Sequence, residues 1–395
     1  MDHHLVMMLH HLYFLIPLKN ENTKKRKLLL RFLDYSNDGF YCYCPDDNKY
    51  VDIDVSSKEL SFKRIRTSRG TVTPHWSASI VDLGDGVAGI ELHSVLKPDL
   101  NPIDGSVIEM VHEAIDTVDS KGYKALVISG DNKNFSAGAN LNIILRAAFY
   151  KDWESIELFT NQMQTILQGL RFAPFPVIAA PYGLVLGGGF ELIGACDRIV
   201  ACSESYIGLV EVGVGLIPGA GGNLRMLSNI SKKINTMMPG AFPIVQKAFE
   251  TVGFAKVATS ADHAKGYGYL VEEDIIITNR KHLLYHAKEA ALAMSDGYTP
   301  PEVENFKLPG KSGRLVIEQS IKGFLKSKKI SDHDALIARK LGHVLTGGDK
   351  GGPFSPVDEQ YLLDIEREAF ISLCGEQKSI ERIQYMLNKG KPLRN

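Results

Sequence analysis

Between about residues 77 and 275, short apolar runs alternate with longer segments in which apolar residues recur every three or four positions. The runs predict strands, and the periodic segments predict amphipathic helices. The predicted strands are Ser79–Leu83, Val87–Leu92, Ala125–Gly130 and Pro176–Ala180, and the predicted helices are 107–118 and a long stretch over 141–169 that can break midway. Strands that alternate with helices imply parallel strands joined by crossover connections, so the predicted fold class is α/β.

After about residue 275 the apolar spacing becomes helical. The amphipathic stretches, separated by Gly/Pro-rich breaks, are 280–294, 312–327, 332–346 and 358–387. The pattern thus divides the chain into four parts, which are an N-terminus (1–28), a small strand-rich piece ending in a linker (29–72), an α/β domain (73–279) and a helical C-terminal region (280–395).

The N-terminus does not continue this pattern. The apolar run Leu5–Leu18 is too short to span a bilayer as a helix. Its basic cluster follows the run, whereas a signal peptide carries its charge before the run. A frayed end and an interfacial anchor both remain open for residues 1–28, and no membrane span is expected.

The strand-rich piece is predicted to hold a β-hairpin. Aromatic and apolar residues at Phe40–Cys44 and Tyr50–Ile53 flank the turn-forming residues Pro45–Asn48. The segment Ser68–Thr73 is typical of a linker.

Composition narrows the possible functions. The chain has 395 residues, 44% of them apolar and 23% charged, which is ordinary for a globular protein. Its net charge of −1 argues against a nucleic-acid-binding protein, which normally has a strong basic excess. Five cysteines make a disulfide framework improbable and favour the reducing cytoplasm as the location.

Three glycine-containing segments suggest a binding site for a developing negative charge. They are Asn134–Ala139, Gly187–Leu192, and Val210–Gly213 leading to Ile217–Gly222. Successive glycines leave backbone amides accessible, and a helix that starts there adds its partial positive charge. The phosphate-loop and dinucleotide-binding patterns are both absent from these segments.

Two glutamates stand close to these glycines in otherwise apolar sequence. Glu191 is followed by Leu192 and Ile193, and Glu211 lies between Val210 and Val212. A carboxylate is costly in apolar surroundings unless it is paired or used in chemistry. Each segment alone would fit a simple turn, but together they favour an active site.

Together the segments resemble the crotonase superfamily, the enoyl-CoA hydratase/isomerase family, over about residues 78–275. The quoted motifs are F-S-A-G-A, G-G-G-x-E-L, a second glutamate and I-P-G-A-G-G, in the family's order. The resemblance implies a crotonase-like ββα superhelix core, flanked by the helical C-terminal extension and the strand-rich N-terminal remnant. It also implies that the amides of Ala139 and Gly188 form an oxyanion hole for the thioester oxygen.

The resemblance also implies the site's remaining roles. Glu191 and Glu211 match the two glutamates that hydratases of the family use, so the expected enzyme adds water to trans-2-enoyl-CoA. An isomerase that moves a 3-enoyl double bond and a non-catalytic thioester-binding remnant are the alternatives. No metal is expected, and the expected acyl-CoA-binding residues are Lys133, Ser136, Ala137, Gly187 and Gly219. The chain departs from the family's pattern at Asn140 and Asn142.

The flanking segments resemble fused β-oxidation proteins in which a 3-hydroxyacyl-CoA dehydrogenase precedes a hydratase. The matching parts are Gly39–Arg69, Ser331–Gly348, Glu359–Asp364 and the end Gly390–Asn395. The resemblance implies the hydratase half of such a protein with most of the dehydrogenase part missing, so neither NAD nor another cofactor is expected. It also implies a homo-oligomer or association with a thiolase.

Overall fold

The structure is a computed structural model that describes residues 33–34, 41–44, 49–52, 56–234 and 240–395. The interpretation of residues 1–28 therefore lies outside the described residues. The predicted hairpin is present, because β2 (Tyr41–Cys44) pairs antiparallel with β3 (Lys49–Asp52), and β2 also pairs with β1 (Leu33–Asp34). Among the described residues, no helix is both long and apolar enough to cross a membrane.

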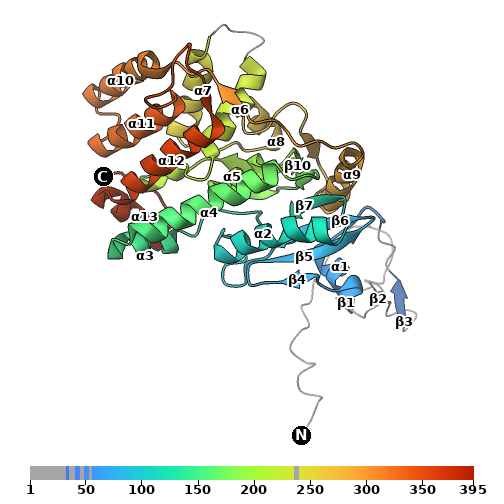
Figure 1. The fold of residues 1–395 in the computed structure, drawn as a ribbon. Coiled ribbons are helices and arrows are strands. Elements are labelled where there is room, and N and C mark those ends of the chain that lie inside the picture. The colour runs from blue at the N-terminus through green and yellow to red at the C-terminus, as the bar shows by residue number, and fades with distance from the viewer. Residues whose placement is uncertain (1–32, 35–40, 45–48, 53–55, 235–239) are drawn as a thin grey trace, which may run out of the picture.

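A seven-stranded mixed sheet forms the centre of the fold (Figure 1). In spatial order its strands are β12 (Ile275–Ile277), β10 (Arg198–Cys202), β8 (Val177–Ala179), β7 (Ala125–Ser129), β6 (Val87–Leu92), β5 (Ala78–Gly84) and β4 (Thr73–Pro74). The pairs from β6 to β12 are parallel, and β4, β5 and β6 pair antiparallel. The crossovers run through helices, which is the α/β arrangement that the sequence predicts.

A second, two-stranded sheet carries the glycine motifs. Its strands β9 (Gly183–Leu186) and β11 (Ser205–Gly208) are parallel, and α5 (Gly188–Gly194) starts directly after β9. The 3₁₀ helix η1 (Glu211–Val214) follows β11 after two residues. The two strands therefore bring the starts of α5 and η1 close together, because neighbouring parallel strands end at the same edge.

Helices surround these sheets. Besides α1 (Phe62–Arg69) and α5, those that precede the C-terminal region are α2 (Gly105–Ser120), α3 (Leu141–Tyr150), α4 (Trp153–Arg171), α6 (Gly222–Ile234), α7 (Phe242–Gly253) and α8 (Ala261–Tyr267). The predicted break in 141–169 falls at Lys151, whose left-handed backbone ends α3 (φ 56°), and Asp152 then caps α4.

The structure adds a helix that the sequence analysis did not predict. Helix α1 (Phe62–Arg69) lies where strands and a linker were expected, and it packs on β5. Phe62 is completely buried, and a Cβ on Gly89 would lie 2.9 Å from its ring. Four of its eight residues are charged, so the helix lacks the long apolar stripe that would reveal it in the sequence.

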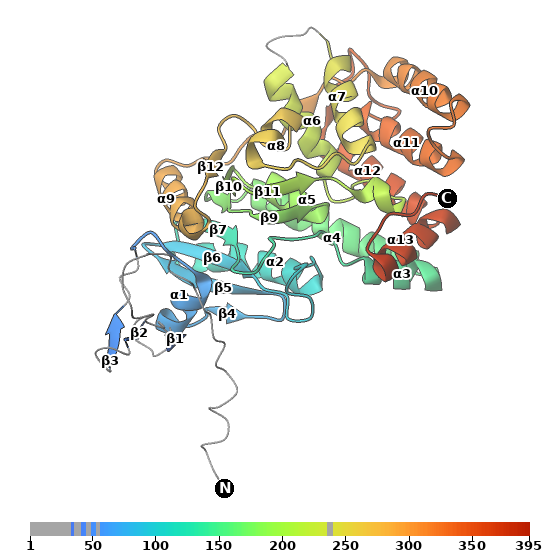
Figure 2. The ribbon, with the colours of Figure 1, turned by 180° about the vertical axis from the view of Figure 1, so that it is seen from behind.

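The C-terminal region packs over the elements that carry the motifs. Its helices are α9 (Leu283–Ser295), α10 (Gly310–Lys326), α11 (Asp332–Leu345), α12 (Glu359–Cys374) and α13 (Gln377–Lys389), with η2 (Arg280–His282) before α9 and the short pair β13 (Asn305–Phe306) and β14 (Val357–Asp358) between them. The predicted helix 358–387 is thus two helices. Helix α12 contacts α4 and α6, and α13 contacts α3 and η1 (Figure 2).

Candidate active site

The F-S-A-G loop runs beside β9 as an additional extended segment. The Ser136 amide donates to the Leu184 carbonyl at 3.0 Å, and the Leu186 amide donates back to the Ser136 carbonyl at 3.0 Å. This pairing carries the end of the loop to the start of α5. A Cβ built on Gly188 would lie 3.3 Å from the Ala139 nitrogen. The two amides that the sequence analysis assigned to an oxyanion hole therefore lie next to each other.

Both amides are available to a ligand. Within the described part of the chain, neither the Ala139 nor the Gly188 N–H has a hydrogen-bond acceptor. Gly188 is the first residue of α5, so the partial positive charge of the helix start acts at the same place. Gly138 has a φ of 101°, and a Cβ there would lie 2.9 Å from the Leu186 carbonyl oxygen, so glycine is required for the close approach.

Glu191 borders this pair of amides from within α5. Its side chain is buried, and a Cβ on Gly188 would lie 3.8 Å from its Oε2. Its Oε1 accepts hydrogen bonds from the amides of Ala220 at 2.8 Å and Gly222 at 3.0 Å. Burial raises the pKa of Glu191, and these backbone N–H groups oppose the increase.

Glu211, the first residue of η1, lies next to Gly187, the residue that precedes Gly188. A Cβ on Gly187 would lie 3.0 Å from Glu211 Oε1. Its Oε2 is buried and has no hydrogen-bond partner among the described residues. Burial raises the pKa of Glu211 well above its ordinary value, and the negative charge of Glu191 raises it further. The site thus contains two carboxyl groups of different surroundings beside two free amides.

The residues expected to bind acyl-CoA occupy varied positions. Lys133 is exposed, whereas Ser136 is completely buried and its Oγ accepts a hydrogen bond from the Gly138 amide at 3.1 Å. Ala137 is half-buried and donates to the Leu100 carbonyl. Their roles toward a substrate stay predictions.

The two expected glycines are closer to the glutamates. Gly187 lies between β9 and α5, and its amide donates to the Gly208 carbonyl at 2.8 Å. The carbonyl of Gly219 accepts a hydrogen bond from Gln164 at 2.8 Å, and a Cβ on Gly219 would lie 2.8 Å from the ring of Phe370. Both glycines therefore permit close packing around the site.

Sequence reasoning missed a third buried carboxyl group, Glu366 of α12. It is completely buried, and it accepts hydrogen bonds from the amides of Gly221 and Asn223, the latter at 3.0 Å. Burial and the negative charge of Glu191 raise the pKa of Glu366 to about 8. The spacing of apolar residues in the sequence could have indicated that Glu366 is buried. It lies four residues after Leu362 and four before Phe370, on the buried face of an amphipathic helix.

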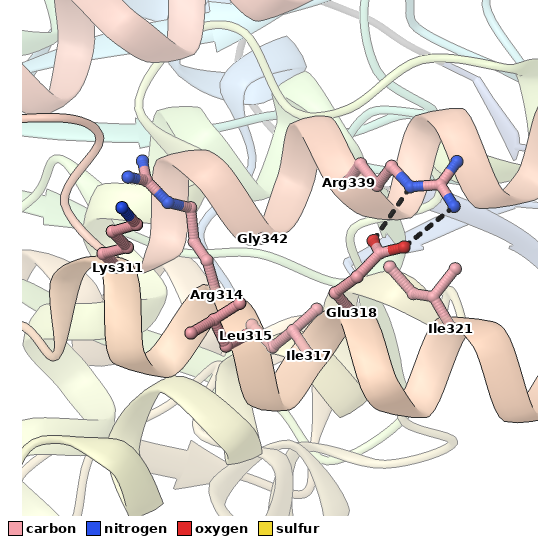
Figure 3. Close-up of a pocket in the computed structure, with 8 residues that line it drawn as sticks. All are labelled: Lys311, Arg314, Leu315, Ile317, Glu318, Ile321, Arg339 and Gly342. Atoms are coloured by element: carbon pink, nitrogen blue, oxygen red, sulfur yellow. Dashed lines mark hydrogen bonds and ion pairs between the residues drawn. The ribbon is translucent and has the colours of Figure 1, made fainter.

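Two cavities lie outside this group of residues. One, of about 280 Å³, lies between α10 and α11, where Arg339 forms an ion pair with Glu318 at 2.9 Å (Figure 3). The other, of about 350 Å³, is mainly apolar and includes Val212 and Gly213 of η1 in its wall. Among the described residues, no group of three or more His, Cys, Asp and Glu side chains is arranged to hold a metal ion.

Comparison with known proteins supports the interpretation of the glycine motifs. Residues 82–264, which contain Ala139, Gly188, Glu191 and Glu211, match the family model described as enoyl-CoA hydratase/isomerase. Residues 82–264 form a domain of the enoyl-CoA hydratase/isomerase family. The expected family is thereby confirmed.

The likeness to β-oxidation proteins extends beyond this domain. A Bacillus subtilis protein named "Probable 3-hydroxyacyl-CoA dehydrogenase" is 40% identical over 371 residues, which are 92% of this chain and 46% of that protein. A Rickettsia felis protein named "Putative fatty acid oxidation complex trifunctional enzyme" is 27% identical over 290 residues, which are 73% of this chain and 36% of that protein. The chain therefore spans less than half the length of these relatives.

Solved structures show the same fold. The crystal structure of an enoyl-CoA hydratase from Bacillus halodurans matches with a TM-score of 0.53 at 17% identity, covering 78% of this chain and 99% of that one. The predicted crotonase-like core is confirmed by this match.

Proposed function

We propose that the enoyl-CoA hydratase/isomerase domain of this chain adds water across the double bond of a trans-2-enoyl-CoA thioester, giving the 3-hydroxyacyl-CoA. The observation that carries this proposal is the pair of free amides, of Ala139 and Gly188, with the carboxyl groups of Glu191 and Glu211 close by. Addition of water oxygen to Cβ moves electrons onto the thioester oxygen. Two neighbouring N–H groups without acceptors of their own can stabilise this charge by donating hydrogen bonds to the oxygen.

The surroundings of the two glutamates suggest which one is the general base and which one is the general acid. Glu191 accepts two backbone hydrogen bonds, which stabilise its ionised form, so we assign it as the base that takes a proton from water. Glu211 has a buried oxygen with no partner and lies near the negative charge of Glu191. Its neutral form is therefore favoured, and we assign it as the acid that delivers a proton to Cα.

We also propose that this reaction needs no cofactor and that the chain by itself does not bind NAD. The sequence holds no segment with the dinucleotide-binding pattern. Purified protein should therefore form no NADH from 3-hydroxybutyryl-CoA and NAD. Steady NADH formation that depends on the protein would contradict this proposal.

The most direct test uses purified protein with trans-2-butenoyl-CoA. We expect the ultraviolet absorbance of the conjugated thioester to fall as 3-hydroxybutyryl-CoA forms, with the product identified by mass spectrometry. A parallel reaction with 3-butenoyl-CoA would reveal an isomerase by the appearance of the conjugated thioester. Isomerisation without hydration would replace the proposed function by the isomerase, and binding without turnover would favour the non-catalytic alternative.

A further inference from the structure

The start of α6 holds two buried carboxyl groups at once. Residues 220–223 supply four successive backbone N–H groups. The first and third donate to Glu191 at 2.8 and 3.0 Å, whereas the second and fourth donate to Glu366. The two side chains therefore alternate along one short segment, and movement of either one would move the segment that holds the other.

Glu366 reaches this segment from the C-terminal helical region. Its neighbours on the buried face of α12 include Leu362, Leu363 and Phe370, which tie the helix to the core. The charged groups that act on or near it are Glu191 from α5, Glu211 from η1 and Arg225 from α6. Among the described residues, no arginine or lysine forms an ion pair with Glu366, and Arg225 lies near Glu359 instead, at 3.7 Å. The charge of Glu366 is thus stabilised chiefly by the two amides.

We propose that Glu366 is a positioning residue for hydration, which fixes the amide segment holding Glu191 and sets the pH range in which Glu211 holds its proton. The proposal rests on the proposed function of the domain. Glu366 touches neither of the oxyanion amides in the structure, so its effect passes through the segment 220–223 and through charge.

The charge of Glu366 changes the pKa of a neighbouring carboxyl group in a definite direction. The negative charge of Glu191 raises the pKa of Glu366. The negative charge of Glu366 in turn raises the pKa of Glu211. Removing the charge of Glu366 should therefore lower the pKa of Glu211. Because the pKa of Glu366 is about 8, its charge is present mainly above that pH, so the alkaline limb of the pH profile of kcat/KM should move to lower pH.

The variant Glu366→Gln keeps the shape of the side chain and removes its charge. We expect the alkaline limb of the profile to move down by about one pH unit, and kcat to fall by about 10-fold with KM nearly unchanged, the lower end of losses for general acid–base catalysis. The matched control is Glu359→Gln. Glu359 is on the same helix and equally buried, but it accepts hydrogen bonds from Gln168 and the Glu304 amide rather than from 220–223. This control should lower the melting temperature without moving the pH profile.

A second measurement does not depend on turnover. In protein labelled with carbon-13 at the glutamate carboxyl carbons, the Glu211 signal is assigned through Glu211→Gln, and its titration midpoint should be lower in Glu366→Gln than in wild type. If wild type hydrates enoyl-CoA and neither the alkaline limb nor the midpoint moves, this inference is overturned and the function stands. If wild type shows no hydration, the proposed function fails, and the titration alone supports or overturns the coupling.

Discussion

Gly187 permits the site to form because it adopts an unusual backbone conformation and has no side chain to collide with Glu211. It has φ 53° and ψ −122°, a conformation that residues with a side chain rarely adopt, and a Cβ would lie 3.0 Å from Glu211 Oε1. We therefore expect Gly187→Ala to lower kcat at least 10-fold and to destabilise the fold by about 1–3 kcal/mol. Urea unfolding and turnover would measure the two effects.

The matched control for this variant is Gly266→Ala. Gly266 lies in α8, a Cβ there would meet nothing within 4 Å, and the residue is exposed. The control should leave activity unchanged and stabilise the helix by about 0.5–1 kcal/mol. Equal behaviour of the two variants would show that Gly187 is not required in the site.

Glu91 gives a pH prediction that does not involve catalysis. It is 2% exposed and lies 3.0 Å from Arg66 of α1, and burial raises its pKa to about 7. Because the folded-state pKa exceeds the unfolded value, this group contributes stability below about pH 4.5, and the contribution is lost as the pH rises through 7. The unfolding free energy of Glu91→Gln should thus fall less between pH 5 and 8 than that of wild type. Urea unfolding at several pH values would measure both proteins. An equal decrease of the unfolding free energy between pH 5 and 8 in the two proteins would contradict this prediction.

At the scale of elements, the C-terminal helices hold η1 in place. Ser379 of α13 donates to the Gly215 carbonyl at 2.6 Å, directly after η1, and its Oγ lies 2.9 Å from His333 Nε2 of α11. We expect Ser379→Ala to cost about 1 kcal/mol of stability and to lower kcat several-fold, because Glu211 begins η1. Thermal unfolding and turnover would test both.

A suitable control is Ser312→Ala. The Ser312 hydroxyl donates to the Pro309 carbonyl at 2.8 Å at the exposed start of α10, far along the chain from η1. Stability can change slightly in this variant, but kcat should not. A normal kcat in Ser379→Ala would mean that η1 is held by its other contacts.

The sequence predicts those elements whose apolar pattern is long or strongly periodic. Helix α2 and strands β5 to β8 lie where the spacing places them, within a few residues. Helix α1 is missed because only Phe62 and Ile65 are buried in it. The predicted helix 358–387 is interrupted because Gly375 ends α12, and a single glycine within an otherwise periodic stretch does not reveal whether the helix stops.

For the molecule as a whole, the sequence predicts which motif residues lie together but not which helix covers them. The motifs predict that Ala139, Gly188, Glu191 and Glu211 lie near one another, and the structure places Gly188 beside Ala139 and Glu191, and Gly187 beside Glu211; their roles stay predictions. Glu366 comes from a segment more than 140 residues after these motifs, through the packing of α12 on α6. No local pattern predicts which helix closes over a site, because such packing depends on long-range contacts.

The measurement that tests the central claim most directly is the hydration rate of trans-2-butenoyl-CoA by wild type, Glu191→Gln and Glu211→Gln. We predict that each substitution lowers kcat by roughly 10²–10⁴-fold with little change in KM, and that the double variant is impaired far less than the product of the two. Circular dichroism and melting temperature would confirm that the variants are folded. A folded single variant with nearly full hydratase activity would contradict the two-glutamate mechanism.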